Sequence, residues 1–244
     1  MQVNSKSLLM LGKKKYTLTV VLSPGDATCT LTYDGVAHTA ISATVNSGTI
    51  ISYSITKSPY GTTTGTITMD ANKTLTATGT TIITPVAFSQ PYLTSNGTLG
   101  GNSFAVASSS GNYPYYAFDS NAQHYYQSGN ATYAPHYIIV YNPDALKLSS
   151  VQFNLYSQNA NSAQKDMSIY GSNTNGNWTL LYSDNVNYAT AGTNTATYLV
   201  NATSYYKYLK FQTSGTNQGS WVVRKIYLTA YTASYSYGWN ITIT

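Results

Sequence analysis

Short runs in which apolar and polar residues alternate, each closed by turn residues, recur along almost the whole chain. Residues 16–22 lead to Ser23-Pro24-Gly25-Asp26, and residues 27–33 end at Asp34-Gly35. A period of two puts the apolar side chains on one face of a strand, and Asp-Gly is a strong hairpin signal. The chain has no Glu, which long helices favour, and it is rich in Thr, Tyr and Val, which favour strands. The pattern predicts a protein that is nearly all β.

The strand runs fall into two groups that are separated by residues 80–85. Pro85 restricts Thr84 to an extended conformation, so we expect a linker there. We predict an N-terminal arm at residues 1–14, a small sandwich at 15–80, a second domain at 85–232 and a strand-like tail at 233–244. The tail alternates, and its period predicts that it pairs with a sheet edge. We expect it to fold back on the second domain, or alternatively to exchange with a neighbouring subunit.

Several ordered motifs between residues 85 and 232 occur together. They are Tyr116-Ala117-Phe118-Asp119-Ser120-Asn121, His124-Tyr125-Tyr126, the apolar strands 135–140 and 151–155, residues 165–173 ending in Gly-Ser-Asn, Trp178 before Leu180-Leu181, and Tyr208-Leu209-Lys210-Phe211. This order resembles the discoidin, or coagulation-factor type C, domain, whose relatives include the family 32 carbohydrate-binding modules. The resemblance implies a jelly-roll β-sandwich that presents ligands on variable loops.

The first domain has a weaker resemblance of its own. Residues 54–61, 65–69 and 72–75 are similar to the small PEGA-type and immunoglobulin-like modules of bacterial surface and phage structural proteins. The expected fold class is therefore all-β, with a small immunoglobulin-like sandwich followed by a discoidin-like jelly roll.

Charge and composition exclude several classes of function. The net charge is +5, yet only 8% of residues are charged, and the one basic run is Lys13-Lys14-Lys15, with Arg224 as the sole arginine. A phosphate-binding face is usually richer in Lys and Arg clusters, so we expect no nucleic-acid partner. No apolar run approaches the ~20 residues that a membrane span needs. The lone Cys29 excludes an intramolecular disulfide and is expected to be buried.

Catalytic and metal motifs are not found in the sequence. His38, His124 and His136 lie far apart, and nothing pairs two of the seven Asp residues as a glycosidase requires. We therefore predict no catalytic residues and no cofactor, and His136 is expected to be structural.

The resemblance implies a calcium site between the Asp119-Ser120-Asn121 turn and an acidic residue near the last strand. This sequence has Lys225 where that acid is expected, which is the wrong charge for a cation ligand. We predict that no metal binds and that Lys225 lies near Asp119.

Aromatic residues interleaved with amides indicate where a sugar could bind. Tyr113, Tyr115, His124 and Tyr125 lie in the loops that flank the Asp119 turn, and aromatic rings stack on the C–H faces of sugars. The secondary candidates are Trp221 and the loop with Asn159 and Asn161. With 25 tyrosines in the chain, clustering by chance is the competing interpretation. By resemblance, Tyr126 and Trp178 are expected in the core.

The leading functional hypothesis is a non-enzymatic structural or adhesion protein on the exterior surface of a phage particle. Its expected partners are other virion proteins or copies of itself in a homo-oligomer, and a cell-surface glycan. The N-terminal residues do not match a secretory signal, whereas the uncharged surface is typical of extracellular proteins, and a virion protein satisfies both observations. The alternatives are an extracellular or cell-surface carbohydrate-binding module of a bacterial glycan-degrading system, and a purely architectural virion protein.

Overall fold

The computed structural model describes residues 12–109, 111, 113–128, 135–157, 166–184, 192–213 and 221–244. Strands make up most of these residues, and the one helix in these ranges is the short 3₁₀ helix η1 (Pro114–Phe118). The prediction of an all-β chain is confirmed. No helix in the same ranges is long and apolar enough to cross a membrane.

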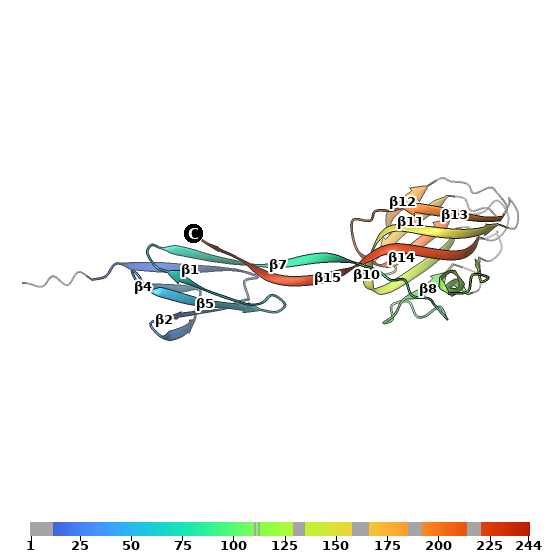
Figure 1. The fold of residues 1–244 in the computed structure, drawn as a ribbon. Coiled ribbons are helices and arrows are strands. Elements are labelled where there is room, and N and C mark those ends of the chain that lie inside the picture. The colour runs from blue at the N-terminus through green and yellow to red at the C-terminus, as the bar shows by residue number, and fades with distance from the viewer. Residues whose placement is uncertain are drawn as a thin grey trace, which may run out of the picture. The chain divides into compact units, whose positions relative to one another are not determined.

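The chain forms two compact units, and one of them is discontinuous in sequence. The first unit joins the chain up to Ile83 with the C-terminal Tyr235–Thr244, and the second is Thr84–Ser234. Figure 1 shows the strands of each unit.

The first unit is a sandwich of two sheets. One sheet has the order β15-β7-β1-β4 and the other has the order β3-β2-β5-β6. The strands are β1 (Lys15–Ser23), β2 (Thr28–Tyr33), β3 (Val36–Thr39), β4 (Ser42–Asn46), β5 (Ile50–Lys57), β6 (Gly61–Thr68), β7 (Lys73–Ala87) and the last part of β15 (Val222–Ile243). Alternate residues of these strands, among them Leu18, Leu31, Ile51 and Leu75, are fully buried between the sheets, as period-two patterning requires. Cys29 is buried with them.

The Asp34-Gly35 hairpin shows how local sequence sets the strand register. Asp34 has a φ of 51° and Gly35 a φ of 77°, which is the pair of left-handed conformations that a type I′ turn needs. The turn places Tyr33 opposite Val36 and starts the pairing of β2 with β3.

The C-terminal tail is a strand of the first unit, so the expectation that it folds back on the second domain is wrong. The Thr74 amide donates to the Thr244 carbonyl at 2.7 Å, and the Thr244 amide donates back to Thr74 at 3.0 Å. The rings of Trp239 and Tyr60 lie 5.5 Å apart, and Trp239 packs against the buried cluster of this unit. The tail has this place because the edge of β7 offers both unpaired backbone groups and an apolar surface for its alternating side chains.

The segment predicted as a linker, residues 80–85, is part of a strand. β7 continues through Thr80 and Pro85 to Ala87, although the units divide at Ile83. Pro85 lacks a backbone N–H, but strands tolerate proline where that position is not needed for pairing, and the side chains of residues 81–87 are exposed.

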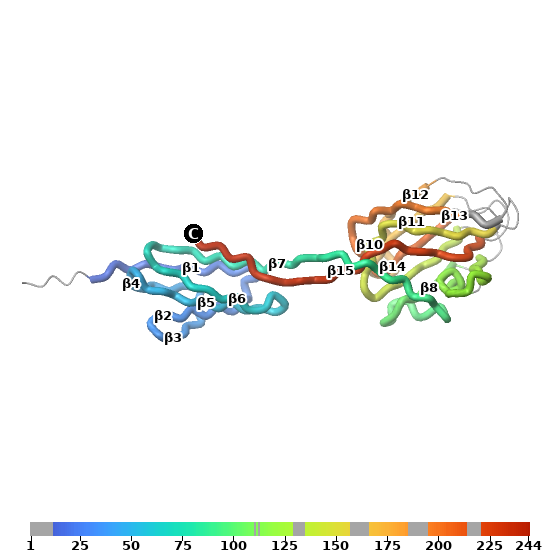
Figure 2. The backbone as a smooth tube through the Cα atoms, in the orientation of Figure 1, coloured from blue at the N-terminus to red at the C-terminus, as the bar shows by residue number. Residues whose placement is uncertain are grey.

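The second unit is a sandwich of two sheets that share one long strand, β10 (His136–Ser157), visible as a continuous path in Figure 2. Its first part pairs with β8 (Ala105–Ser108) and β14 (Tyr206–Thr213), and the latter continues to β11 (Met167–Ser172) and β12 (Thr179–Asp184). Its second part pairs with β13 (Gly192–Leu199) and β15, and β15 also pairs with β9 (Tyr126–Gln127).

Side chains from both parts of β10 meet in one core. Ile138 comes from the first part and Phe153 from the second, and both are fully buried in the same cluster. Tyr126 is buried in this core as expected, and its ring meets that of Trp221 edge-on at 6.1 Å. The register of β10 shifts between Tyr141 and Leu146, where the strand passes from one sheet to the other.

Candidate functional site

The helix η1 begins with a residue in an uncommon backbone conformation. Tyr113 has φ 57° and ψ 58°, the left-handed region that a bulky side chain seldom adopts, and Pro114 follows it at the first turn. Ala117 and Phe118 are buried and hold the helix on the core. The Tyr113 ring is 54% exposed, so the strained residue presents its aromatic face to solvent. Such conformations persist only where the surrounding structure maintains them, and they are frequent at binding sites.

Gly111 brings a second segment against this one. It has a φ of +94°, and a Cβ added to it would collide with the carbonyl oxygen of Gln127 and lie 2.9 Å from the Cα of Ser128. Glycine therefore allows the chain before η1 to lie directly on the backbone that follows β9. Ser128 fixes that backbone in turn, because its hydroxyl accepts a hydrogen bond of 2.8 Å from the Trp221 amide.

A cavity of about 460 Å³ lies between these segments. Its described lining includes the aromatic side chains Tyr113, Tyr116, His124 and Tyr125, and the amides of Gln123 and Gln127. The rings form one continuous group, with 5.1 Å between the centroids of Tyr113 and Tyr116 and 4.3 Å between those of Tyr116 and His124. None of the described lining residues is an Asp, Lys or Arg.

The His124 ring is held in place by the Asp119 turn. The Asn121 side-chain nitrogen lies 3.0 Å from His124 Nε2, and an amide nitrogen can only donate, so Nε2 accepts. The hydrogen is then on Nδ1, which donates to Asp119 Oδ2 at 2.5 Å. Asn121 Oδ1 accepts from the Gln123 amide at 3.0 Å, which agrees with this orientation of the side chain. Both ring nitrogens are used inside the protein, so His124 offers a ligand its ring face.

Lys225 completes this network from β15. Its Nζ contacts Asp119 Oδ1 and donates to the carbonyl of Tyr116 at 2.6 Å, and the Lys225 and Asp119 side chains are only 9% and 10% exposed. Burial alone raises the pKa of Asp119, but the hydrogen bonds from Lys225 and His124 outweigh it and hold that pKa below its ordinary value. The carboxylate is therefore ionised, and it accepts from Lys225, His124 and the Asn121 backbone amide.

This arrangement does not fit the calcium ion that the sequence resemblance implies. An ammonium group lies against the carboxylate and carbonyl oxygens that a calcium ion would need. Nor do three His, Cys, Asp or Glu side chains gather as metal ligands anywhere in the described ranges. The predicted proximity of Lys225 to Asp119 is found in the structure.

Two further tyrosines lie beside the cavity. Tyr115 meets Tyr113 and Tyr116 with ring centroids 6.1 and 4.7 Å apart, but it packs partly on the core, and its hydrogen bond with Tyr116 raises its pKa. Tyr156 of β10 stacks on Tyr125 at 6.4 Å. Of the four leading candidates, Tyr113, His124 and Tyr125 line the cavity, whereas Tyr115 contacts two of the lining rings without lining it.

The remaining residues assigned from the sequence do not line this cavity in the described part of the chain. Trp221, a secondary ligand candidate, is 1% exposed and packs on Tyr126 and Phe153, so it belongs to the core. Asn159 and Asn161 lie outside the described residues. Trp178 was expected in the core, but it is only half-buried and lies outside the core cluster, because β12 is an edge strand.

Trp178 instead contacts the side chain of Lys210. The Lys210 Nζ lies 4.7 Å from the ring centroid of Trp178 and 4.5 Å from that of Tyr170, a cation–π arrangement on the outer face of the sheet.

Gly111, Gln123, Gln127 and Ser128 also line the cavity and were not among the candidates from the sequence. Gln123 and Gln127 provide amides, and Gly111 allows the close backbone approach. The two glutamines flank His124-Tyr125-Tyr126 directly, and this position beside the aromatic residues could have identified them. No local signal identifies Gly111, because its role depends on a segment sixteen positions away.

Comparison with known proteins gives structural likeness only. No family model matches the sequence, and no curated protein matches it. Among solved structures, the chain is similar to the family 32 module of Clostridium perfringens NanJ in complex with galactose, at 17% identity, 55% and 93% coverage of the two chains and a TM-score of 0.42. It is also similar to a pectin-binding carbohydrate-binding module, at 16% identity, 51% and 88% coverage and a TM-score of 0.42. A third neighbour is the family 32 module of AlyQ in complex with 4,5-unsaturated mannuronic acid, at 19% identity, 52% and 92% coverage and a TM-score of 0.41. Each likeness covers about half of this chain.

Proposed function

We propose that the second unit is a glycan-binding module that holds a neutral saccharide in the cavity bounded by Tyr113 and Tyr125. The observation that carries this proposal is the pair of exposed tyrosine rings, 54% and 40% accessible, at a cavity lined with side-chain amides and free of Asp, Lys and Arg in its described part. Rings stack on the apolar face of a sugar and amides bind its hydroxyls, whereas charged groups are not needed for a neutral ligand.

The size of the cavity and the number of rings set the expected affinity. A volume of about 460 Å³ accommodates one or two sugar rings. Such a contact binds on the order of millimolar, near −4 kcal/mol, so effective adhesion needs many linked copies.

The role is proposed to be non-catalytic. Glycoside hydrolysis ordinarily uses a pair of carboxyl groups beside the bond that breaks. Among the described residues, the carboxylate nearest in sequence to the cavity lining is Asp119, and Lys225 and His124 already bind it. A carboxylate that is held ionised between two donors is unsuited to act as a general acid.

For the biological setting, we propose the exterior of a phage particle, where copies of the chain and other virion proteins supply multivalency. A chain in which only 8% of residues are charged, so that hydroxyls and amides keep its surface hydrated, supports an extracellular location. The same site would serve equally in a bacterial surface or secreted glycan-degrading system. The neighbouring genes distinguish the two settings: capsid, portal and tail genes support the first, and glycosidase and transporter genes support the second.

The direct test is glycan-array binding by the full chain, with a double variant Tyr113→Ala and Tyr125→Ala. Removing an exposed ring face costs roughly 1 kcal/mol of binding, so the pair is expected to lower the affinity at least tenfold. Because both side chains are exposed, the melting temperature should stay close to that of the wild type. Tyr92→Ala is the matched control, since its ring is 70% exposed and is not part of the described lining.

Unchanged glycan binding by a folded double variant contradicts the proposal. If that variant unfolds, Gln123→Ala provides the test, because its exposed amide lines the cavity without supporting the core. A wild-type chain that binds no glycan on a broad array would exclude the glycan function itself.

A further inference from the structure

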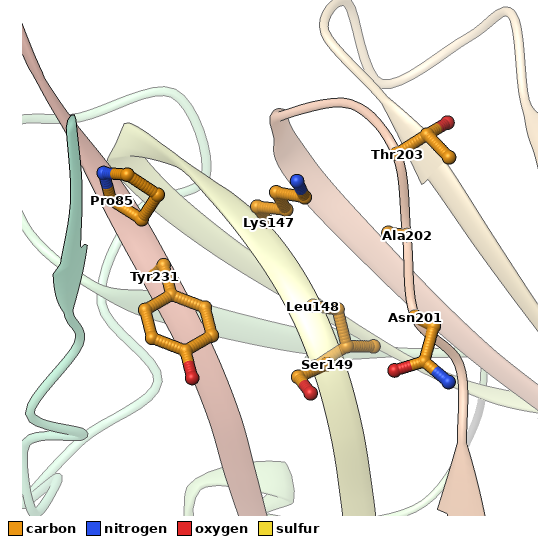
Figure 3. Close-up of a pocket in the computed structure, with 8 residues that line it drawn as sticks. All are labelled: Pro85, Lys147, Leu148, Ser149, Asn201, Ala202, Thr203 and Tyr231. Carbon is orange, nitrogen blue, oxygen red and sulfur yellow. The ribbon is translucent and has the colours of Figure 1, made fainter. Parts of the chain in front are cut away.

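A second cavity lies in the same unit, lined by different residues (Figure 3). Its volume is about 580 Å³, and its lining comes from Lys147 and Ser149 of β10, Tyr231 of β15, Pro85 of β7, and Asn201 and Thr203 in the segment between β13 and β14. None of these residues lines the aromatic cavity described above.

One side of the second cavity is made of rings. The Tyr231 side chain is 36% exposed, and Pro85, which is also exposed, lies next to it in Figure 3. Tyr231 pairs with Lys147 across β15 and β10, so the ring and the lysine side chain start from adjacent positions in the sheet. A flat tyrosine ring beside a proline ring is a surface suited to the C–H face of a sugar.

The opposite side carries polar groups on a fixed backbone. The Asn201 amide and the Val200 amide both donate to the Ser149 carbonyl at 2.9 Å, and the Ala202 amide donates to the Leu148 carbonyl at 2.8 Å. Asn201 has a φ of 48°, a left-handed conformation that asparagine adopts more readily than most residues. The backbone thus holds Asn201 in the lining, to which Ser149 and Thr203 add hydroxyls, and these three side chains can bind sugar hydroxyls.

Lys147 distinguishes this cavity from the aromatic one. Its side chain lies between the ring side and the amide side in Figure 3. It forms no ion pair with any residue in the described ranges, and no described lining residue carries a carboxylate. A single ammonium group without a counter-ion, half-buried in a pocket lined by neutral groups, attracts an anion.

We propose that this second cavity binds an acidic saccharide of the hexuronate class. The carboxylate of the sugar pairs with Lys147, its C–H face lies on Tyr231, and its hydroxyls bind the side chains of Asn201, Ser149 and Thr203. One protein unit would then have two sites with different preferences, a neutral sugar at Tyr113 and Tyr125 and a carboxylated one at Lys147 and Tyr231.

The test is isothermal titration of the full chain with trigalacturonate and with its neutral counterpart, galactotriose. Lys147→Met keeps most of the side-chain length and removes the charge. We expect it to weaken trigalacturonate binding roughly tenfold or more and to leave galactotriose binding unchanged. Lys207→Met is the matched control, because Lys207 is an exposed lysine of the same unit that does not line either cavity. Added salt should weaken trigalacturonate binding by the wild type.

The location of the ligand is checked independently by backbone amide chemical shifts. Trigalacturonate should shift the Asn201 and Thr203 signals and leave those of Gln123 and Tyr125 unchanged. Unchanged trigalacturonate binding in Lys147→Met, or loss of trigalacturonate binding in Tyr113→Ala/Tyr125→Ala but not in Lys147→Met, overturns the second site. If inorganic phosphate competes with trigalacturonate and trigalacturonate does not shift the Asn201 amide signal, the cavity is a simple anion site, and this result also overturns the proposal.

The outcomes separate this inference from the proposed function. Loss of neutral-glycan binding in the tyrosine double variant bears only on the aromatic cavity, and the Lys147 variant bears only on the second one. Either site can fail while the other stands.

Discussion

Replacing Lys225 by Met should destabilise the second unit strongly, although the two side chains have similar length. Lys225 is the buried cation that pairs with Asp119, and both side chains are at most 10% exposed. In the variant the ionised carboxylate stays in a poorly hydrated place with one donor fewer. The loss of stability therefore comes mainly from the uncompensated Asp119 charge, and the lost attraction between Lys225 and Asp119 is the smaller contribution.

The size of the effect follows from this burial. Removal of one partner from a buried ion pair costs about 3–5 kcal/mol, and the lower end applies because His124 Nδ1 and the Asn121 amide still donate to Asp119. About 3 kcal/mol corresponds to a fall of roughly 6–12 °C in the melting temperature of a unit of this size. Adding Asp119→Asn to Lys225→Met should recover part of the loss, since the uncompensated charge is then removed.

Urea denaturation and thermal melting near neutral pH measure this effect in the full chain. The pKa of Asp119 lies below its ordinary value in the folded protein, so the stability from this carboxylate is present above about pH 3.9 and disappears as the pH falls through the lowered folded pKa. The Lys225→Met deficit should shrink over that acidic range and should persist at high salt. A variant that melts within about a degree of the wild type, or a deficit that about 1 M salt abolishes, would refute the assignment of a buried pair.

Three further predictions concern other parts of the chain. His136 is fully buried, its ring nitrogens have no partner in the described ranges, and burial lowers its pKa, so the stability of the folded protein should fall as the pH drops below about 6.5. In His136→Leu the fall in melting temperature between about pH 7.5 and about pH 5 should be smaller, and an equal fall in both proteins would contradict this assignment. Gly171→Ala should lower the free energy of unfolding, measured with urea, by about 1–3 kcal/mol, because its Cβ would lie 2.5 Å from the Tyr206 ring. Gly176→Ala, whose Cβ would have its nearest neighbour at 3.7 Å, should change that free energy little, and equal changes in the two variants would contradict this prediction. Trp239→Ala should destabilise the first unit by about 2–3 kcal/mol and leave the stability of the second unit unchanged. Differential scanning calorimetry can measure the two transitions, and a shift of the second unit's transition would contradict the assignment of the tail to the first unit.

Local patterns were enough to predict the strands, because alternation and turn residues act within a few positions. The Asp34-Gly35 hairpin is an example, since both left-handed conformations follow from the two residue types. The tail shows where local patterns stop being sufficient. Its alternation predicts a partner edge but does not say which one, and the choice of β7 depends on the edge and apolar surface that the first unit leaves open.

The candidate site was predictable in part for the same reason. Tyr113, His124 and Tyr125 lie within thirteen positions of each other, and a short helix and turn bring them to one cavity. Trp221, which lies just before β15, was assigned wrongly, because the residues around it in the sequence do not show whether its ring faces a loop or the core. The proximity of Lys225 to Asp119 was predictable only through the resemblance, since 106 positions separate the two residues.

The discontinuous first unit has a consequence for how the protein is made. A ribosome releases β1 to β7 early, but the strand that completes their sheet is contained in Tyr235–Thr244, so Thr84–Ser234 has fully emerged before the first unit can close. During that interval the edge of β7 is exposed in the nascent chain, where a chaperone or a second nascent chain can reach it. A stop codon shortly before codon 235 would accordingly spare the unit formed by Thr84–Ser234 and damage the unit that contains β1 to β7.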